Sequence, residues 1–218
     1  MRIDVFTLVP HAFAWLTEQR PLAGVLGNQL ELRLFNYREA TPLRALQVDD
    51  EPYGGGAGMV LRVDVVAAAL DAVYGGVRDH GVIALTPQGR QLTQAVVEEL
   101  AREEQLTLLS ARFEGFDDRI VRHLASDAVS VGPYVLSNGD LPAMTVLDAV
   151  ARRLPGALSE GSGEWESFSA ELEGGLEYPQ YTRPAEFRGW KVPDVLLSGD
   201  HGRIEDWRRE QSRARSVR

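Results

Sequence analysis

Residues 130–142 read S-V-G-P-Y-V-L-S-N-G-D-L-P, and we expect the rest of the chain to be organised around them. They follow a short apolar run and lead into a predicted helix, residues 143–154. Gly132 and Gly139 allow backbone turns that a Cβ atom would obstruct. Such a loop presents N–H and C=O groups that can bind the polar edges of a flat ligand. Taken alone, glycine and proline between a strand and a helix indicate only a turn.

Composition places the chain among soluble globular proteins with one large domain or two smaller ones. It has 218 residues, of which 44% are hydrophobic and 25% charged, both ordinary values. No run of about 18 apolar residues is present, so no membrane span is expected. The lack of cysteine excludes disulfides and thiol catalysis. Because the N-terminus reads as a strand and not as a signal peptide, a cytoplasmic location is favoured. The 4 scattered histidines do not indicate a metal site.

The net charge of −9 argues against a nonspecific nucleic-acid binder. RNA binding stays compatible with this charge, because phosphate contacts need only a local basic surface. The C-terminus supplies one in Arg203, Arg208, Arg209, Arg213, Arg215 and Arg218. A solvated helix end explains these arginines equally well.

The order of predicted elements is typical of a parallel α/β fold. Strands are expected at residues 2–9, 30–36, 81–85, 106–110 and 128–131, and helices at 11–18, 63–73, 93–104, 120–124, 143–154 and 203–215. Thr93 is the predicted N-cap of its helix. The strand–helix–strand unit at 81–110 predicts a crossover between parallel strands. Because α/β folds bind ligands at the carboxyl ends of such strands, the loops at 86–90, 111–115 and 130–142 are expected to converge.

A second glycine-rich stretch, D-D-E-P-Y-G-G-G-A-G-M, occupies residues 49–59. It is not a phosphate loop, because no G-K-[ST] follows, and not a dinucleotide fingerprint, because no predicted strand leads into it. It is either a flexible surface loop or backbone packed close to a base or another loop. Asp50 either anchors this loop or faces substrate.

Further blocks follow in order: L-T-P-Q-G-R at 85–90, R-F-E-G-F-D-D-R at 112–119, E-Y-P-Q-Y-T-R-P at 177–184 and G-W-K-V-P-D-V-L-L-S-G-D-H at 189–201. With the two glycine-containing stretches, they resemble the bacterial tRNA (guanine-N1)-methyltransferase family TrmD, of the SPOUT superfamily, nearly end to end. The resemblance implies methyl transfer from S-adenosylmethionine to N1 of the guanosine 3′ of the anticodon, position 37 of tRNA. It also implies an α/β fold in which a parallel sheet is flanked by helices, with a deep C-terminal trefoil knot and a small helical C-terminal domain.

The resemblance implies three regions: a knotted α/β domain at 1–158 that binds S-adenosylmethionine, a flexible linker at 159–176 and a tRNA-binding domain at 177–218. The linker is rich in Gly, Ser and Glu, as spacers are. Trp165 and Phe168 instead suggest a segment that orders on binding. The family implies a cytoplasmic homodimer that binds the tRNA anticodon arm, with the active site at the subunit interface. Whether Mg²⁺ assists is left open.

Site residues are assigned by the resemblance. Those expected to bind the cofactor are Thr86, Pro87, Ala111, Phe113, Glu114, Gly115, Ser130, Val131, Gly132, Tyr134, Val135, Leu136, Asn138, Gly139 and Pro142. Those expected to contact guanine or tRNA are Asp50, Tyr53, Gly56, Ser167, Tyr181, Arg183 and His201. Ala111 and Asn138 stand where the family usually has glycine, and Phe113 where it has tyrosine. The chain is therefore expected to be a divergent member.

The chemistry requires a base and a cation. Guanine N1 carries a proton at neutral pH, so a base must remove it, and the charge that spreads to O6 needs a donor. In the resembled family the base is the aspartate of a D-S-F motif, and the matching residues here are Glu166-Ser167-Phe168. Glu166 is therefore the predicted base, with Glu164 and Glu171 as alternatives.

The arginine that the family uses to stabilise this charge matches Arg152, because of its spacing to Pro155, and Arg153 is its competitor. Two other functions stay open. One is a knotted methyltransferase with another target base, against which the C-terminal blocks argue. The other is a catalytically impaired RNA-binding relative, which the replacements at Glu166 and Ala111 keep open.

Overall fold

The computed structural model describes residues 1–76, 79–159, 162–163 and 165–216. These fall into two compact units, Met1–Ala157 and Leu158–Arg218. The first contains a five-stranded parallel sheet in the order β2-β1-β6-β5-β7. Its strands are β1 (Arg2–Thr7), β2 (Glu31–Asn36), β5 (Gly81–Gln91), β6 (Gln105–Ser110) and β7 (Asp127–Ser130).

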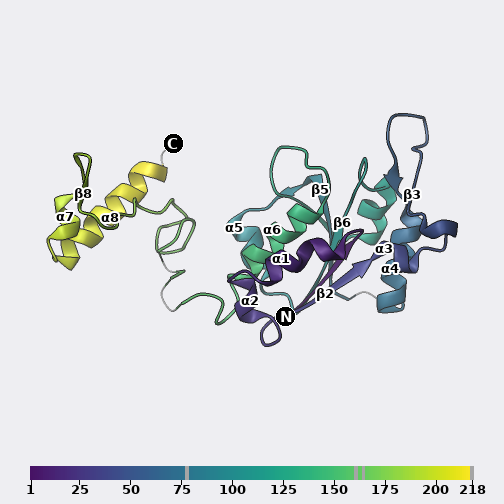
Figure 1. The fold of residues 1–218 in the computed structure, drawn as a ribbon, viewed down its shortest axis with the longest axis horizontal. Coiled ribbons are helices and arrows are strands. Elements are labelled where there is room, and N and C mark those ends of the chain that lie inside the picture. Colours follow the sequence, from purple (N-terminus) through teal and green to yellow (C-terminus); the bar gives the residue numbers. More distant parts are fainter. Residues whose placement is uncertain (77–78, 160–161, 164, 217–218) are drawn as a thin grey trace. The chain divides into compact units, whose positions relative to one another are not determined.

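Helices cover both faces of this sheet (Figure 1). One face carries the 3-10 turn η1 (Pro10–Phe13) and helices α1 (Ala14–Thr17), α2 (Leu22–Val25), α5 (Gln94–Leu100) and α6 (Asp140–Ala151). The other carries α3 (Tyr37–Ala40), α4 (Val63–Tyr74) and the π-helical turn η3 (Ile120–Leu124), and a 3-10 turn, η2 (Arg44–Leu46), follows α3. Neighbouring strand residues point to opposite faces, so Val5 joins the first core and Phe6 the second. The predicted parallel sheet flanked by helices is confirmed.

The crossover predicted at 81–110 is present as β5, α5 and β6, with β5 and β6 parallel. Thr93 caps α5 as predicted, its hydroxyl accepting a hydrogen bond from the Val96 N–H at 3.4 Å. That helix ends at Leu100, earlier than expected. None of the helices formed by the described residues is both long and apolar enough to cross a membrane.

Two boundaries near the first quoted stretch differ from the prediction. Helix α6 begins at Asp140 and not at residue 143, so Pro142 lies in its first turn. Proline is tolerated there because first-turn N–H groups have no partner within the helix. Strand β5 runs on to Gln91, past its predicted end at Leu85. Both Leu85 and Arg90 pair with Val129 of β7, so the residues between them leave the sheet and return to it.

The glycine-rich segment, residues 51–59, joins two short antiparallel strands, β3 (Asp49–Asp50) and β4 (Val60–Leu61). The expectation that no strand leads into it is therefore wrong. The segment nevertheless differs from a dinucleotide fingerprint, because it returns as a strand where that motif begins a helix.

A buried carboxylate ties the middle of the sheet to α4. Asp4 is fully buried and accepts two hydrogen bonds of 2.7 Å from the Arg33 guanidinium. The Tyr74 hydroxyl donates to the same carboxylate at 2.6 Å. Burial and this hydrogen bond raise the pKa of Tyr74 well above its usual value. A buried charge needs such partners, because an unpaired one costs several kcal/mol, about 3–5 when a partner is removed.

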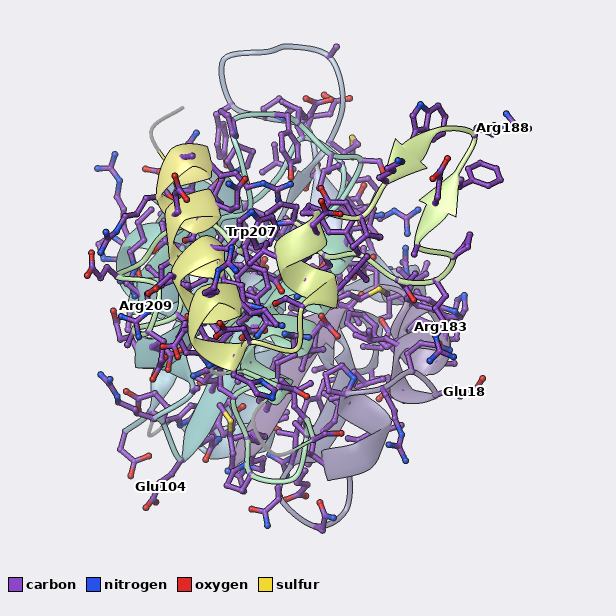
Figure 2. All side chains as sticks on the ribbon, turned by 90° about the vertical axis from the view of Figure 1, so that its left-hand side faces the viewer. Glu18, Glu104, Arg183, Arg188, Trp207 and Arg209 are labelled. Carbon is purple, nitrogen blue, oxygen red and sulfur yellow. The ribbon has the colours of Figure 1, made fainter. Side chains whose placement is uncertain are left out.

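The second unit contains the hairpin β8 (Glu186–Phe187) and β9 (Trp190–Lys191), followed by α7 (Asp194–Leu197) and α8 (His201–Ser216). The hairpin was not predicted: the strand expected at residues 128–131 was the last one in the predicted order of elements. Its two-residue turn has positive φ at both Arg188 (55°) and Gly189 (83°), as tight hairpin turns require. Arginine is unusual in such a turn, so the sequence carries no turn signal here. The turn places Arg188 at the tip of the hairpin (Figure 2).

Candidate functional site

A cavity of about 390 Å³ lies at the carboxyl edge of β5, β6 and β7. These strands are neighbours in the sheet, so the loops that follow them meet, as loops at one edge of a parallel sheet do. The cavity is lined by every residue predicted to bind the cofactor: Thr86, Pro87, Ala111, Phe113, Glu114, Gly115, Ser130, Val131, Gly132, Tyr134, Val135, Leu136, Asn138, Gly139 and Pro142. The sequence blocks at 85–90, 112–119 and 130–142 thus line the same cavity.

Sequence reasoning missed several lining residues, namely Leu85, Gln88, Arg112, Phe116, Asp118, Val121, Val129 and Ser137. Most lie inside the blocks quoted above, so the blocks contain most of the cavity lining but do not identify each side chain. Val121 belongs to the turn η3, and no motif pointed to it. Its place at the cavity follows from the packing of η3 against the second core.

Close backbone packing fixes the loop before α6. The Gly139 N–H donates to the Ala111 carbonyl at 2.7 Å. A Cβ on Gly139 would lie 2.8 Å from the Ala111 nitrogen and 2.9 Å from the Ser110 Cα. Glycine is therefore required here for close approach. Beside it, the Asn138 side-chain oxygen accepts from the Asp140 N–H at 2.9 Å.

Asp140 connects the start of α6 to the sheet. Its side chain is 4% exposed, and Oδ1 accepts from the Thr7 hydroxyl at 2.6 Å and from the Ser110 hydroxyl at 2.7 Å. Thr7 ends β1 and Ser110 ends β6. A carboxylate in a helix's first turn is also favoured by the helix dipole. Asp140 belongs to the stretch at 130–142, but its role depends on contacts with distant strands and is visible only in the structure.

Glu114 lies where the glycine-rich segment meets the cavity wall. Its N–H donates to the Met59 carbonyl at 2.9 Å, and its side chain packs on Gly58 so closely that a Cβ there has no room. Arg119 pairs with Asp117 at 2.6 Å, and its hydrogen bond lowers the pKa of that carboxyl.

The substrate residues predicted in the glycine-rich region lie outside the described lining of the cavity. Asp50 accepts from Arg62 at 2.6 Å, which favours the anchoring interpretation of its role. Tyr53 is fully exposed, at 101% of its reference area. Gly56 has a φ of 137°, a backbone conformation that side chains rarely adopt.

The two arginine candidates lie at the end of α6. Arg152 is the C-cap residue, and its N–H donates to the Asp148 carbonyl at 3.1 Å. The Arg153 guanidinium pairs with Glu98 of α5 at 2.8 Å. Arg153 thus contacts the neighbouring helix through its side chain.

The remaining predicted residues belong to the second unit. Ser167 accepts from the Glu177 N–H at 2.9 Å, and the Glu166 carbonyl accepts from the Ser169 N–H at 3.1 Å. Of the alternative bases, Glu171 is exposed, whereas Glu164 lies outside the described residues, as does Arg218 of the basic C-terminal cluster.

The predicted RNA-contacting side chains of this unit are exposed. Tyr181 is 48% exposed, and its ring centroid lies 6.4 Å from that of Trp207. Arg183 is exposed in the preceding loop, and His201 is the first residue of α8. Among the described residues, no group of three or more His, Asp or Glu side chains is placed to hold a metal ion.

Comparison with known proteins gives a match over residues 1–218 to the family model described as tRNA (guanine-1)-methyltransferase TrmD. The chain is similar to the "tRNA (guanine-N(1)-)-methyltransferase" of Geobacillus kaustophilus, with 45% identity over 99% of this chain and 88% of that protein. It shows 47% identity to the protein of that name from Lactiplantibacillus plantarum, over 99% of this chain and 87% of that protein. For the Synechococcus protein the identity is 49%, over 99% and 88% respectively.

Proposed function

The chain belongs to the tRNA (guanine-1)-methyltransferase family TrmD, and from this we propose that it transfers the methyl group of S-adenosylmethionine to N1 of guanosine 37 in tRNA. The observation that carries the proposal is the whole-chain family match, together with a cavity lined by residues of the loops at 86–90, 111–115 and 130–142. Neither alternative function, another target base or a relative without catalysis, is favoured by relatives that are named for the N1 activity at 45–49% identity.

The cavity suits S-adenosylmethionine in size and chemistry. Its volume of about 390 Å³ lies within the range of small-ligand pockets, roughly 300–1,000 Å³. Leu85, Val129 and Leu136 provide apolar surface for the adenine ring, and the backbone of the loop before α6 provides donors and acceptors for its edge. The carboxylates of Glu114 and Asp118 would offset the positive charge of the sulfonium. Once bound, the cofactor supplies an activated methyl group.

Catalysis is assigned to the chain's own residues. Glu166 would accept the proton from guanine N1 and so free the nitrogen lone pair. N1 would then take the methyl group in line as the S–C bond breaks and the thioether S-adenosylhomocysteine leaves. Arg152 neutralises the negative charge that develops at O6. Ser167, Tyr53 and Gly56 orient the guanosine, which accelerates the reaction by holding the reacting atoms in line. Asp50, which accepts a hydrogen bond from Arg62, anchors the glycine-rich segment that carries Tyr53 and Gly56.

We propose that the second unit grips the anticodon arm. Tyr181 and the exposed aromatic residues of the hairpin, Phe187 and Trp190, are 48%, 51% and 71% exposed, which suits stacking on unpaired bases. Arg183 and His201 lie on the same unit and would contact phosphates. Residues 177–218 would then act as a small RNA-binding domain, residues 159–176 as the linker to it, and residues 1–158 as the methyltransferase domain.

Three further features belong to the same proposal. The loop before α6 is threaded as a deep trefoil knot, as membership of the family implies. The protein works as a cytoplasmic homodimer, in which the partner's linker and C-terminal domain complete each active site.

Whether methyl transfer requires Mg²⁺ is tested by running the assay below with and without a chelator.

The test is methyl incorporation from labelled S-adenosylmethionine into an unmodified tRNA transcript with G at position 37, with the product mapped by nuclease digestion and mass spectrometry. We expect one-methylguanosine at that position. Glu166→Gln and Arg152→Ala should each lower the rate by about a hundredfold or more, whereas Arg153→Ala should not. Methylation that survives Glu166→Gln would move the base to Glu164 or Glu171, and product at another base would overturn the proposed target.

A further inference from the structure

The segment that carries Glu166 folds back on itself, within the second unit. The Phe168 N–H donates to the Gly175 carbonyl at 2.7 Å, and the Gly174 N–H donates to the Ser169 carbonyl at 2.9 Å. Ser167 closes the loop further, because its hydroxyl accepts from the Glu177 N–H at 2.9 Å. Residues 165–177, called the base loop below, therefore form one closed loop whose two arms are joined by hydrogen bonds.

The returning arm of the base loop is attached to α8 at two serines one helical turn apart. The Leu176 N–H donates to the Ser216 hydroxyl at 2.8 Å, and that hydroxyl donates to the Ser212 carbonyl at 2.9 Å. Gly175 is packed against the same pair: a Cβ there would lie 2.6 Å from the Ser216 hydroxyl and 3.4 Å from the Ser212 hydroxyl. Only glycine allows this approach.

Side chains on both sides of this contact strengthen it. The Arg209 guanidinium lies 5.7 Å from the centre of the Trp165 ring, and that of Arg208 lies 4.8 Å from the centre of the Tyr178 ring. Both distances suit cation–π attraction. Leu172, in the middle of the loop, is 7% exposed. The base loop is thus bound to α8 at its beginning, at its return and just beyond its end.

We propose that Ser212, Ser216 and Gly175 are positioning residues for catalysis: they hold the base loop on α8 and so set the place of the Glu166 carboxylate. This rests on the proposed function, in which Glu166 is the general base. It follows that the Glu166 carboxylate moves together with the second unit. Binding of the tRNA to that unit would therefore also bring the general base to the substrate.

The first measurement detects the attachment without using activity. In the full-length protein, hydrogen exchange followed by mass spectrometry should show protected amides in peptides that cover residues 165–177. Gly175→Ala should remove this protection, because its Cβ would also lie 2.9 Å from the Leu172 carbonyl oxygen. Gly24→Ala, in α2, is the matched control, since the nearest atom to its Cβ would be 3.9 Å away.

The second measurement is the single-turnover rate of methyl transfer at saturating tRNA and S-adenosylmethionine. Gly175→Ala should lower this rate about a hundredfold, the effect of misplacing a catalytic group by roughly 1 Å, with both ligands bound as tightly as in wild type. Ser216→Ala, which removes one hydrogen-bond acceptor, should lower it roughly two- to tenfold. Ser216→Thr retains the hydroxyl and should restore the rate.

The outcomes separate the two proposals. Rapid hydrogen exchange of the base loop in the wild-type protein overturns the positioning role. So does a wild-type rate of methyl transfer in Gly175→Ala and Ser216→Ala when the base loop of these variants has lost its protection. A wild-type protein that binds S-adenosylmethionine but methylates no tRNA overturns the proposed function and the positioning role with it. In that case the exchange data still decide whether α8 holds the loop.

Discussion

Replacing Asp140 with alanine tests whether this carboxylate holds the loop before α6, residues 131–139, on the sheet. The change leaves the hydroxyls of Thr7 and Ser110 without the acceptor that they reach at 2.6 and 2.7 Å. Each orphaned buried donor costs about 1–3 kcal/mol, and the lost charge in the first turn of α6 adds about 0.3–1 kcal/mol. We therefore expect Asp140→Ala to lower the free energy of unfolding by about 2–7 kcal/mol and the melting temperature by roughly 4–28 °C.

The assay is urea unfolding followed by circular dichroism, together with calorimetric titration of S-adenosylmethionine at a temperature where the variant is folded. Asp140→Asn keeps one acceptor oxygen in place and should lose less stability. Asp194→Ala is the control, because Asp194 also begins a helix but is exposed. If Asp140→Ala unfolds within about 1 kcal/mol of wild type and binds the cofactor equally well, the carboxylate does not hold the loop.

Further predictions concern packing, close approach and charge. Leu147→Ala, in the buried face of α6, should cost about 2–5 kcal/mol in urea unfolding; a loss below 1 kcal/mol would contradict the assigned core. Gly139→Ala should cost about 1–3 kcal/mol and weaken cofactor binding in the same titration, and unchanged binding would show that the loop adapts. Arg119→Gln should raise the pKa of Asp117, seen by NMR titration. The pKa of Asp117 is lower in the folded state than in the unfolded state. The stability that Arg119 provides is therefore fully present above the unfolded-state pKa of Asp117, and it is lost as the pH falls through the folded-state pKa. The stability difference between wild type and Arg119→Gln should therefore shrink in acid, and a difference that stays constant there would contradict the pairing.

The sequence was sufficient for the parts of the fold that depend on local pattern. Alternating and continuous apolar runs located the strands of the sheet, and Thr93 marked the start of α5 because an N-cap is a local hydrogen bond. The meeting of the loops that line the cavity could also be predicted, since loops at the carboxyl ends of parallel strands gather at one edge whatever their residues.

What could not be predicted depends on residues distant in sequence. No local signal places β7 beside β5, or brings Asp140 to the hydroxyls at the ends of β1 and β6. The hairpin at 186–191 was missed because Arg188 occupies a turn position where asparagine, aspartate or glycine is expected. The composition of the linker region gave no sign that Gly175 is packed against α8, because close approach is a property of both segments.

The double pairing of Val129 has a consequence for ligand exchange. Residues 86–89 leave the sheet opposite Val129 and return to it at the same residue, and Gly89 lies so close to the backbone of Ala128 that a Cβ would not fit. This wall of the cavity can open only if strand pairing breaks at both ends. In the loop between β7 and α6, which also lines the cavity, Val135 is 85% exposed. We therefore expect the cofactor to enter and leave past the loop that carries Val135, so that substitutions there change the rate of cofactor release, while the β5 side of the cavity stays closed throughout the catalytic cycle.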